Sequence, residues 1–303
     1  MTALLTEEKI GGMSRIIIRP DGNFDVGKIF DCGQCFRFDR VENSEHEVEY
    51  SGVAFGRVVS FGQDGDTVYI YNATEDDYKN IWRKYLGLNV DYREIDRRLL
   101  CIDSIPFREA VNYGNGIRIL SQDPYETIIS FIISQNNNIP RIKQIIERLS
   151  AWCGQPVAYP EEMERHLSGR SSLYSFPTVE ALNSLGIDGL FEAKTGFRAK
   201  YIYDATERIL SGDVDIEHLR SICGTADGLE YLCKIKGVGP KVASCILLFS
   251  CERYDAFPVD VWIKKAMTRY FPDKDFSPEL FGEYAGIAQQ YLFYYERYLG
   301  GEK

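Results

Sequence analysis

Hydrophobic and polar residues alternate in three neighbouring stretches of the N-terminal third of the chain. Residues 47–55, 57–61 and 67–71 combine this alternation with β-branched and aromatic side chains, which favour extended strands. Asp64 and Gly65 stand between the last two stretches and are typical turn residues. The pattern predicts an antiparallel sheet, because short turns join strands that run in opposite directions.

The spacing of apolar residues becomes helical after this sheet. Residues 74–77 form a capping box that predicts a helix running to Tyr85, and residues 92–101 predict another. Beyond residue 106 the helical period dominates, as in the stripe formed by Ile142, Ile145, Ile146, Leu149 and Trp152. We expect an α+β fold in which an antiparallel sheet domain with helices (residues 1–105) precedes an all-α domain (residues 106–303).

A glycine-rich turn separates two apolar runs in the C-terminal part of the chain. The runs cover residues 229–235 and 242–249, and the turn contains Gly237, Gly239 and Pro240. Both glycines can adopt positive φ and let a nucleic-acid backbone come close, whereas Pro240 suits the first position of a helix. The free amides at that helix start would attract phosphate. The segment predicts a helix-hairpin-helix, although similar turns also join helices that bind no nucleic acid.

Lys241 and Asp260 are the two candidate catalytic residues. Lys241 stands in the first turn of the second predicted helix, where the helix dipole disfavours the charged ammonium form. An uncharged amine is a nucleophile, although a solvated surface lysine is the commoner state of any single Lys. Asp260 precedes an apolar run, so it is expected to cap a helix, which alone could explain an Asp there. The combination of hairpin, Lys and Asp is rarer than any of its parts.

Residues 232–267 resemble the signature of the helix-hairpin-helix Gly-Pro-Asp family of DNA glycosylases, specifically the 8-oxoguanine DNA glycosylases. The matching sequences are LCKIKGVGPKVASCILL and PVDVWIKKA. The resemblance implies a base-excision repair enzyme that flips a damaged base out of DNA. Lys241 would attack the sugar and form a Schiff base that leads to strand cleavage, and Asp260 would stabilise the charge developing on the sugar. It also implies a sheet domain like that of the TATA-binding protein.

Two further segments resemble DNA-binding elements of the same family. In QNNNIPR, the resemblance implies that Asn136 fills the gap left by the flipped base and that Arg141 reads the orphaned cytosine. In GFRAK, Phe197 would wedge beside the estranged base and Arg198 would donate to cytosine. Taken alone, the asparagine run predicts only a polar loop between helices.

The residues expected to bind the flipped base come from three places. DCGQCFR resembles the family's G-Q-x-F-R element, which implies that the Gly33 carbonyl faces the lesion. N7 of 8-oxoguanine carries a hydrogen where guanine has a lone pair, so a carbonyl there would bond the first and repel the second. Gln289 would bond the Watson–Crick edge, while Phe293 and Cys245 would stack on the two faces. Alone, Gln289 and Phe293 are four residues apart and could simply pack on one helix face.

Charge is distributed unevenly along the chain. The net charge is −10, with 35 basic and 45 acidic residues, which opposes binding to a polyanion. Residues 234–269 nevertheless hold seven cations against three anions. We expect a basic face on an acidic body, with double-stranded DNA containing oxidised guanine as the partner and tight binding only at low or moderate salt.

Cysteine usage and hydropathy limit the other classes of protein. The eight cysteines show no secreted-type disulfide framework, and none follows Cys251, which excludes the iron–sulfur branch of these glycosylases. We expect no metal and no other cofactor. No run of about twenty apolar residues occurs, so no membrane association is expected. The expectation is a monomer in the bacterial cytoplasm, associated with the nucleoid.

Two other functions stay open on the sequence. One is a related glycosylase for alkylated or other damaged bases, against which Lys241 argues, because members without lyase activity often lack this lysine. The other is a non-catalytic helix-hairpin-helix DNA-binding protein, which would leave the joint presence of Lys241, Asp260, Gln289 and Phe293 to chance. One departure concerns Trp262, where the resemblance implies a phosphate-contacting histidine.

Overall fold

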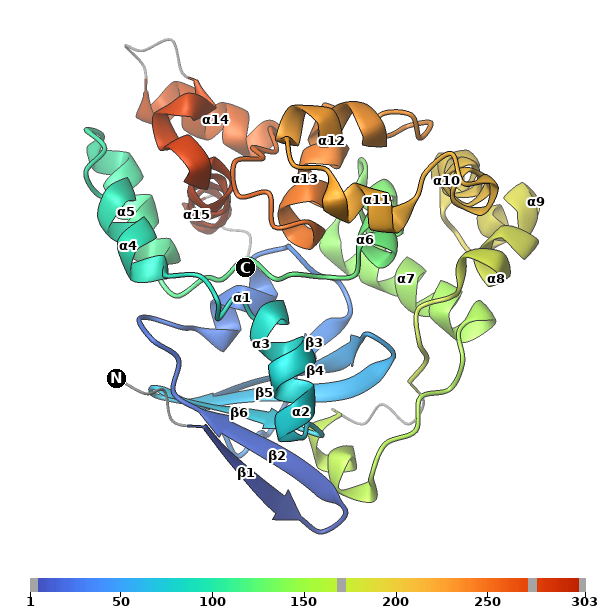
Figure 1. Cartoon of the computed structure of the whole chain (residues 1–303), viewed down its shortest axis with the longest axis horizontal. Coiled ribbons are helices and arrows are strands. Elements are labelled where there is room, and N and C mark those ends of the chain that lie inside the picture. The colour runs from blue at the N-terminus through green and yellow to red at the C-terminus, as the bar shows by residue number, and fades with distance from the viewer. Residues whose placement is uncertain (1–4, 168–172, 272–276, 300–303) are drawn as a thin grey trace.

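A six-stranded antiparallel sheet forms the base of the molecule. The computed structural model describes residues 5–167, 173–271 and 277–299. The strands lie in the order β1-β2-β6-β5-β4-β3 (Figure 1). They cover Leu5–Ile10 (β1), Met13–Ile18 (β2), Phe38–Arg40 (β3), Val48–Ala54 (β4), Arg57–Asp64 (β5) and Thr67–Tyr71 (β6).

Three of the strands coincide with the predicted ones. β4, β5 and β6 match the alternation between residues 47 and 71, and Ser60 of β5 pairs with Ser51 on one side and Tyr71 on the other. The sequence reasoning did not predict β1, β2 or β3. A glycine pair joins β1 to β2, and Gly11 in that turn has a φ of 59°.

One face of the sheet packs against α1 (Val26–Asp31) and against a helical segment formed by α2 (Glu75–Asp77), a π-helical turn (Tyr78–Trp82) and α3 (Arg83–Tyr85). The predicted capping box at Thr74 is present. Phe30 of α1 stacks on Phe61 of β5 with ring centroids 5.2 Å apart, and Trp82 meets the same Phe61 ring edge-on. This aromatic layer fixes α1 between the sheet and the helices (Figure 1).

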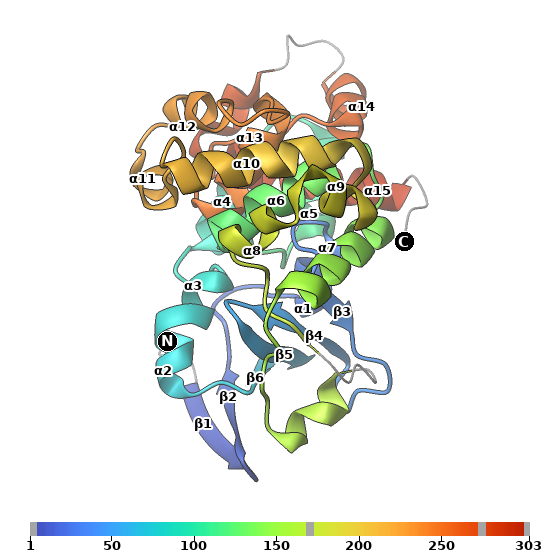
Figure 2. The ribbon, with the colours of Figure 1, turned by 90° about the vertical axis from the view of Figure 1, so that its right-hand side faces the viewer.

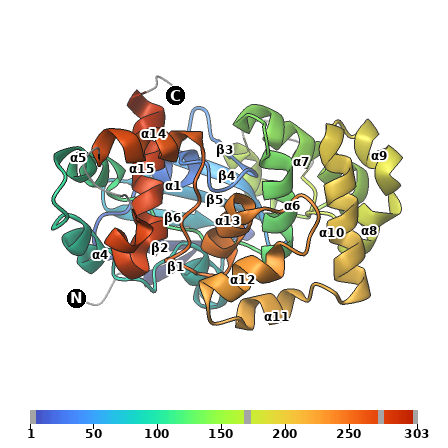
Figure 3. The ribbon, with the colours of Figure 1, turned by 90° about the horizontal axis from the view of Figure 1, so that it is seen from above.

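Helices form most of the remaining described chain, and the predicted α+β fold is confirmed. Seen from above, α15 lies beside α5 and α14, over the sheet (Figure 3). The helices are α4 (Tyr92–Leu99), α5 (Ile105–Gly114), α6 (Pro124–Ser134), α7 (Ile139–Cys153), α8 (Val179–Ser184), α9 (Gly186–Glu192), α10 (Ala199–Ser211), α11 (Ile216–Ser221), α12 (Thr225–Leu232), α13 (Pro240–Ser250), α14 (Val261–Tyr270) and α15 (Ala285–Leu299), with 3-10 turns at Glu161–His166, Gly196–Arg198 and Pro278–Tyr284.

The predicted apolar stripe of α7 is only partly correct. Ile142, Ile145, Ile146 and Leu149 are buried, but Trp152 is 51% exposed. Trp152 lies in the last turn of α7, one turn beyond Leu149.

The sheet and the helices share side chains where they meet. Cys32 and Phe36 belong to the N-terminal part of the sequence, yet they pack in the helical core with Tyr92 of α4. Leu120, in the connection from α5 to α6, packs in the core above the sheet. The division of the chain at residues 105 and 106 therefore stays a prediction.

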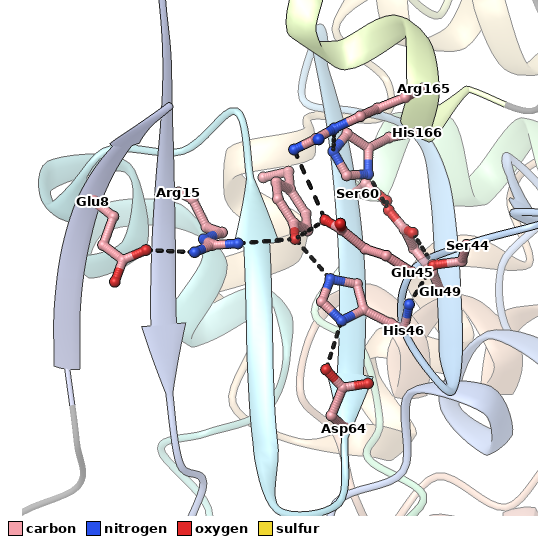
Figure 4. Close-up of polar contacts among 11 residues, drawn as sticks. Glu8, Arg15, Ser44, Glu45, His46, Glu49, Ser60, Asp64, Arg165 and His166 are labelled. Carbon is pink, nitrogen blue, oxygen red and sulfur yellow. Dashed lines mark hydrogen bonds and ion pairs between the residues drawn. The ribbon is translucent and has the colours of Figure 1, made fainter. Parts of the chain in front are cut away.

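The other face of the sheet is covered by a segment that returns from the helical part. In this segment His166 lies 2.6 Å from the Glu49 carboxylate of β4, which also accepts a hydrogen bond from Ser60 (Figure 4). His46 similarly bridges Asp64 and the Tyr71 hydroxyl group. Because the His166–Glu49 contact joins the chain after α7 to the sheet, the helical part is anchored at a second place besides α1.

Candidate active site between the sheet and the helices

The predicted hairpin is present, with α12 and α13 as its helices. Gly237 has a φ of 81°, and a Cβ there would lie 2.4 Å from the Tyr201 ring, so the turn requires glycine. Gly239 does not use the positive φ that glycine can adopt: its φ is −101°, and it is the extended N-cap residue of α13. No side chain caps α13, and the space beside Gly239 is open. The first amides of α13 are therefore available to donate hydrogen bonds to an external anion.

Lys241, Cys245 and Asp260 are neighbours. Burial raises the pKa of the Cys245 thiol; the Lys241 ammonium group, which donates to the sulfur, opposes this shift and the Asp260 carboxylate reinforces it. Nζ of Lys241 also lies 5.8 Å from the centroid of the Phe131 ring. The fold thus places both candidate catalytic groups close to one buried thiol.

Asp260 caps α14, as its position before an apolar run predicts. Its Oδ1 accepts a hydrogen bond from the Ile263 amide at 2.8 Å. Trp262, in the first turn of α14, has the Lys265 ammonium group 4.4 Å from its ring centroid. Lys265 is thus a cation beside the position where a histidine was expected.

α15 carries Gln289 and Phe293 one helical turn apart. Gln289 is 4% exposed, and its Oε1 has no hydrogen-bond partner among the described residues. A buried acceptor without a donor costs on the order of 1–3 kcal/mol, so such an atom indicates a ligand or a water molecule that supplies the donor. Phe293 is half-buried, and the Arg297 guanidinium lies 5.6 Å from its ring centroid.

α1, α7 and α15 lie close to one another (Figure 2), and Gly33, which follows α1, has Ile139 of α7 and Phe293 of α15 as neighbours. Its φ is 79°, and a Cβ there would stand 3.3 Å from Cε1 of Phe293 and 3.6 Å from Cδ1 of Ile139. The backbone conformation therefore favours glycine, and the neighbouring ring would have to shift by a few tenths of an ångström for a Cβ. Because Ile139 begins α7, the loop that holds Asn136 ends beside Gly33.

Arg198 holds the loop between α6 and α7 through hydrogen bonds to its backbone. Its buried guanidinium donates to the carbonyl oxygens of Gln135 and Asn136, in each case at 2.8 Å. Asn136 is exposed and has a φ of 49°, a left-handed conformation that is uncommon outside glycine. Phe197 is 52% exposed and its ring centroid lies 4.5 Å from the Arg198 guanidinium, while Arg141 is exposed. The two arginines thus occupy different environments.

Two glutamines that hold the site in place do not stand out in the sequence. Gln290 donates to the Cys32 carbonyl at 2.7 Å, and Gln122 donates to the Gln34 carbonyl at 2.7 Å. For Gln290, the one available signal was a second glutamine inside an otherwise apolar helical pattern. For Gln122 we find none, because its partner lies 88 residues away along the chain.

Metal and membrane features were sought in the described ranges. No group of three or more His, Cys, Asp or Glu side chains there is arranged to hold a metal ion. No helix in these ranges is both long and apolar enough to cross a membrane.

Known proteins match this chain along most of its length. A family model described as 8-oxoguanine DNA glycosylase, N-terminal domain, matches residues 16–128, and another described as HhH-GPD superfamily base excision DNA repair protein matches residues 129–284. N-glycosylase/DNA lyase OGG1 of Arabidopsis thaliana is 30% identical over 295 residues, which cover 87% of this chain and 75% of that protein. The chain belongs to the 8-oxoguanine DNA glycosylase family.

Solved structures of this family match the fold of this chain over nearly its whole length. The 8-oxoguanine glycosylase/lyase of Clostridium acetobutylicum, in complex with double-stranded DNA containing cytosine opposite 8-oxoG, is 41% identical with a TM-score of 0.86 and 98% coverage of each chain. MBOgg1, in complex with a low-affinity DNA ligand, is 38% identical with the same TM-score and covers 98% of this chain and 99% of that one. A 3-methyladenine DNA glycosylase from Archaeoglobus fulgidus, 20% identical with a TM-score of 0.69, shares the fold; the match covers 93% of this chain and 99% of that one.

Substitutions of Asp260 should separate its structural role from its chemical one. Asn caps a helix as well as Asp does, so Asp260→Asn should keep the free energy of unfolding within about 0.5 kcal/mol of the wild type, whereas Asp260→Ala should lower it by about 1 kcal/mol. Both should slow base release in single-turnover assays on the order of 100-fold, because each removes the carboxylate charge. Urea denaturation and product gels measure the two effects. Wild-type base release by Asp260→Asn would contradict a chemical role.

Proposed function

We propose that this chain removes 8-oxoguanine paired with cytosine from double-stranded DNA and then cleaves the strand at the abasic site. The observation that carries the proposal is the convergence of Gly33, Gln289 and Phe293 in one place, together with Lys241 and Asp260 close to one buried thiol. The Clostridium relative, named for the same activity, was solved with DNA that contains this base pair. It supports the same substrate for this chain.

Lesion recognition rests on two hydrogen-bond acceptors. The Gly33 carbonyl accepts the N7 hydrogen of 8-oxoguanine and repels the N7 lone pair of guanine. The unpartnered Oε1 of Gln289 suits the N1 and N2 hydrogens on the Watson–Crick edge of the same base, because both are donors. Phe293 and Cys245 stack on the two faces of the base. Binding the lesion thus removes the cost of the orphaned buried oxygen.

The chemistry follows from the bond to be broken. Uncharged Lys241 attacks C1′ as the bond from C1′ to N9 breaks, and the base leaves with the bonding electron pair and takes a proton. The Asp260 carboxylate stabilises the positive charge that develops on the sugar. Opening of the sugar ring gives a Schiff base between C1′ and Nζ. Loss of a C2′ proton then breaks the C3′–O3′ bond, and water hydrolyses the imine to regenerate the amine.

The DNA-binding surface surrounds this pocket on the helical part of the chain. Asn136 and Phe197 are exposed and suited to fill the space of the extruded base. Beside them a groove of about 380 Å³ is lined in part by Arg141, Arg148 and Lys194, which suits an orphaned base and nearby phosphate. The open amides of α13 at Gly239 are suited to bind a further phosphate.

The two parts of the chain have different roles in this proposal. In the proposal, residues 1–105 supply the lesion-reading carbonyl, and residues 106–303 supply the chemistry and the DNA-binding surface. In the proposal the protein acts as a monomer, since the roles described above require no residue of a second subunit. Its DNA substrate and the bacterial relative support a place on the nucleoid in a bacterial cytoplasm.

The runner-up functions account for less of the site. A glycosylase for alkylated bases would share the fold, as the Archaeoglobus enzyme does, but does not require a carbonyl aimed at N7. A non-catalytic DNA-binding protein would not require the buried unpartnered oxygen of Gln289. No further observation favours either function.

Borohydride trapping tests the lysine mechanism. The wild-type chain should form a covalent adduct with a duplex carrying 8-oxoguanine opposite cytosine, because borohydride reduces the Schiff base. Lys241→Gln should lose the adduct while still binding the duplex. Lys236→Gln, which removes a cation from the same hairpin, is the matched control and should trap normally. An undiminished adduct in Lys241→Gln would refute the assignment of the nucleophile.

Substitution of Arg141 tests the reading of the opposite base. Arg141→Ala should slow excision opposite cytosine roughly tenfold and leave excision opposite adenine nearly unchanged, because a guanidinium contact to a base edge is lost. Arg198→Ala should also relax the preference, and should lower excision opposite every base because Arg198 holds the Asn136 loop. Arg148→Ala removes a charge from the same groove and should keep the preference. Single-turnover rates with each opposite base measure this, and an unchanged preference in Arg141→Ala would exclude its role.

A further inference from the structure

The peptide groups around Gly33 are held by side chains on both sides. The Cys32 carbonyl accepts from Gln290 at 2.7 Å, and the Gln34 carbonyl accepts from Gln122 at 2.7 Å. The described residues donate no hydrogen bond to the Gly33 carbonyl itself. The oxygen proposed to meet the lesion is thus left available between two oxygens that are already bonded.

The downstream side of Gly33 is fixed further by the Gln34 side chain. Its amide nitrogen donates to the carbonyls of Ile29 and Arg118, and its oxygen accepts from the Leu120 amide at 2.8 Å. Gln34 is fully buried. On the upstream side, Gln290 is the side chain that holds the peptide between Cys32 and Gly33.

Such restraint matters because glycine has little intrinsic preference for one peptide orientation. Gly33 already sits at a φ of 79°, and without a Cβ the adjoining peptide plane can rotate at low cost. If the peptide between Gly33 and Gln34 turned over, an N–H would face the base in place of the carbonyl. A donor there would favour the N7 lone pair of guanine over the N7 hydrogen of 8-oxoguanine, which would reverse the selectivity.

We propose that Gln290 is a positioning residue that keeps the Gly33 carbonyl aimed at the lesion and so maintains selectivity against guanine. The inference rests on the proposed function. Gln290 is 2% exposed, and it adjoins Gln289, so one helix sets both the reader of the Watson–Crick edge and the restraint on the N7 reader. Because successive helical residues point about 100° apart, Gln289 faces the pocket while Gln290 faces the Cys32 carbonyl.

The test compares three rates in Gln290→Met, which keeps side-chain length and volume but removes the donor. The rates are single-turnover excision of 8-oxoguanine opposite cytosine, excision of guanine in the same sequence, and strand cleavage at a preformed abasic site. Excision of 8-oxoguanine should fall about tenfold, and the ratio of 8-oxoguanine to guanine excision should fall with it. Abasic-site cleavage should stay within about twofold, because no base is read there.

Tyr291→Phe is the matched control. Tyr291 is the next residue on α15, equally buried, and its hydroxyl donates to Asp96 of α4 at 2.7 Å and not to the Gly33 loop. It should keep the selectivity even though it also loses a buried hydrogen bond. Gln122→Met frees the Gln34 carbonyl on the other side and should resemble Gln290→Met. If Gln290→Met does not fold, Gln122→Met decides by the same criteria.

Two results would overturn the proposal. One is wild-type selectivity in Gln290→Met, and the other is an equal loss of all three rates, which would reduce Gln290 to a general structural contact. Failure of the proposed function gives a different result, because the wild-type chain itself would then not excise 8-oxoguanine. The wild-type rate on 8-oxoguanine is therefore measured first, and the proposal is overturned with the function if that rate is absent.

Discussion

The candidate site depends on the docking of α15 against the loop that follows α1. Gln290 donates to the Cys32 carbonyl, and the Phe293 ring lies close to Gly33, 3.3 Å from where a Cβ would stand. Tyr291 secures the same helix through Asp96 of α4. Without this junction the sheet would hold a loop with a carbonyl, and the helices would hold a lysine and a carboxylate, but no lesion pocket would join them.

Recognition and chemistry are supplied by different elements, and this separation explains the arrangement of the fold. In the proposed mechanism Lys241 acts from the first turn of α13 and Asp260 from the N-cap of α14. The proposed readers of the base come from α15 and from the loop after α1. A basic segment around the hairpin compensates locally for the net charge of −10, so DNA affinity is expected to weaken as salt rises.

Local sequence patterns predicted several of the strands and helices, although not β1, β2 or β3. They could not predict contacts between residues that are far apart in the sequence. Strand alternation gave β4 to β6, and the apolar run after Asp260 gave its cap. Periodicity placed Trp152 on the core face of α7 but carries no information on how far the covering elements extend. Both hairpin glycines can adopt a positive φ, but the sequence could not tell that Gly237 alone does so while Gly239 is an extended helix N-cap. The meeting of Gly33 with Phe293 came only from the family resemblance, since residues so far apart leave no local signal.

The most direct test of the account is the crystal structure of Lys241→Gln bound to a duplex with 8-oxoguanine opposite cytosine. We predict that N7 of the flipped base lies about 2.7–3.2 Å from the Gly33 carbonyl oxygen. The base should stand between Phe293 and Cys245, with its Watson–Crick edge at Gln289. A base bound elsewhere would contradict the account. So would a peptide between Gly33 and Gln34 that presents its N–H to the base in place of its carbonyl.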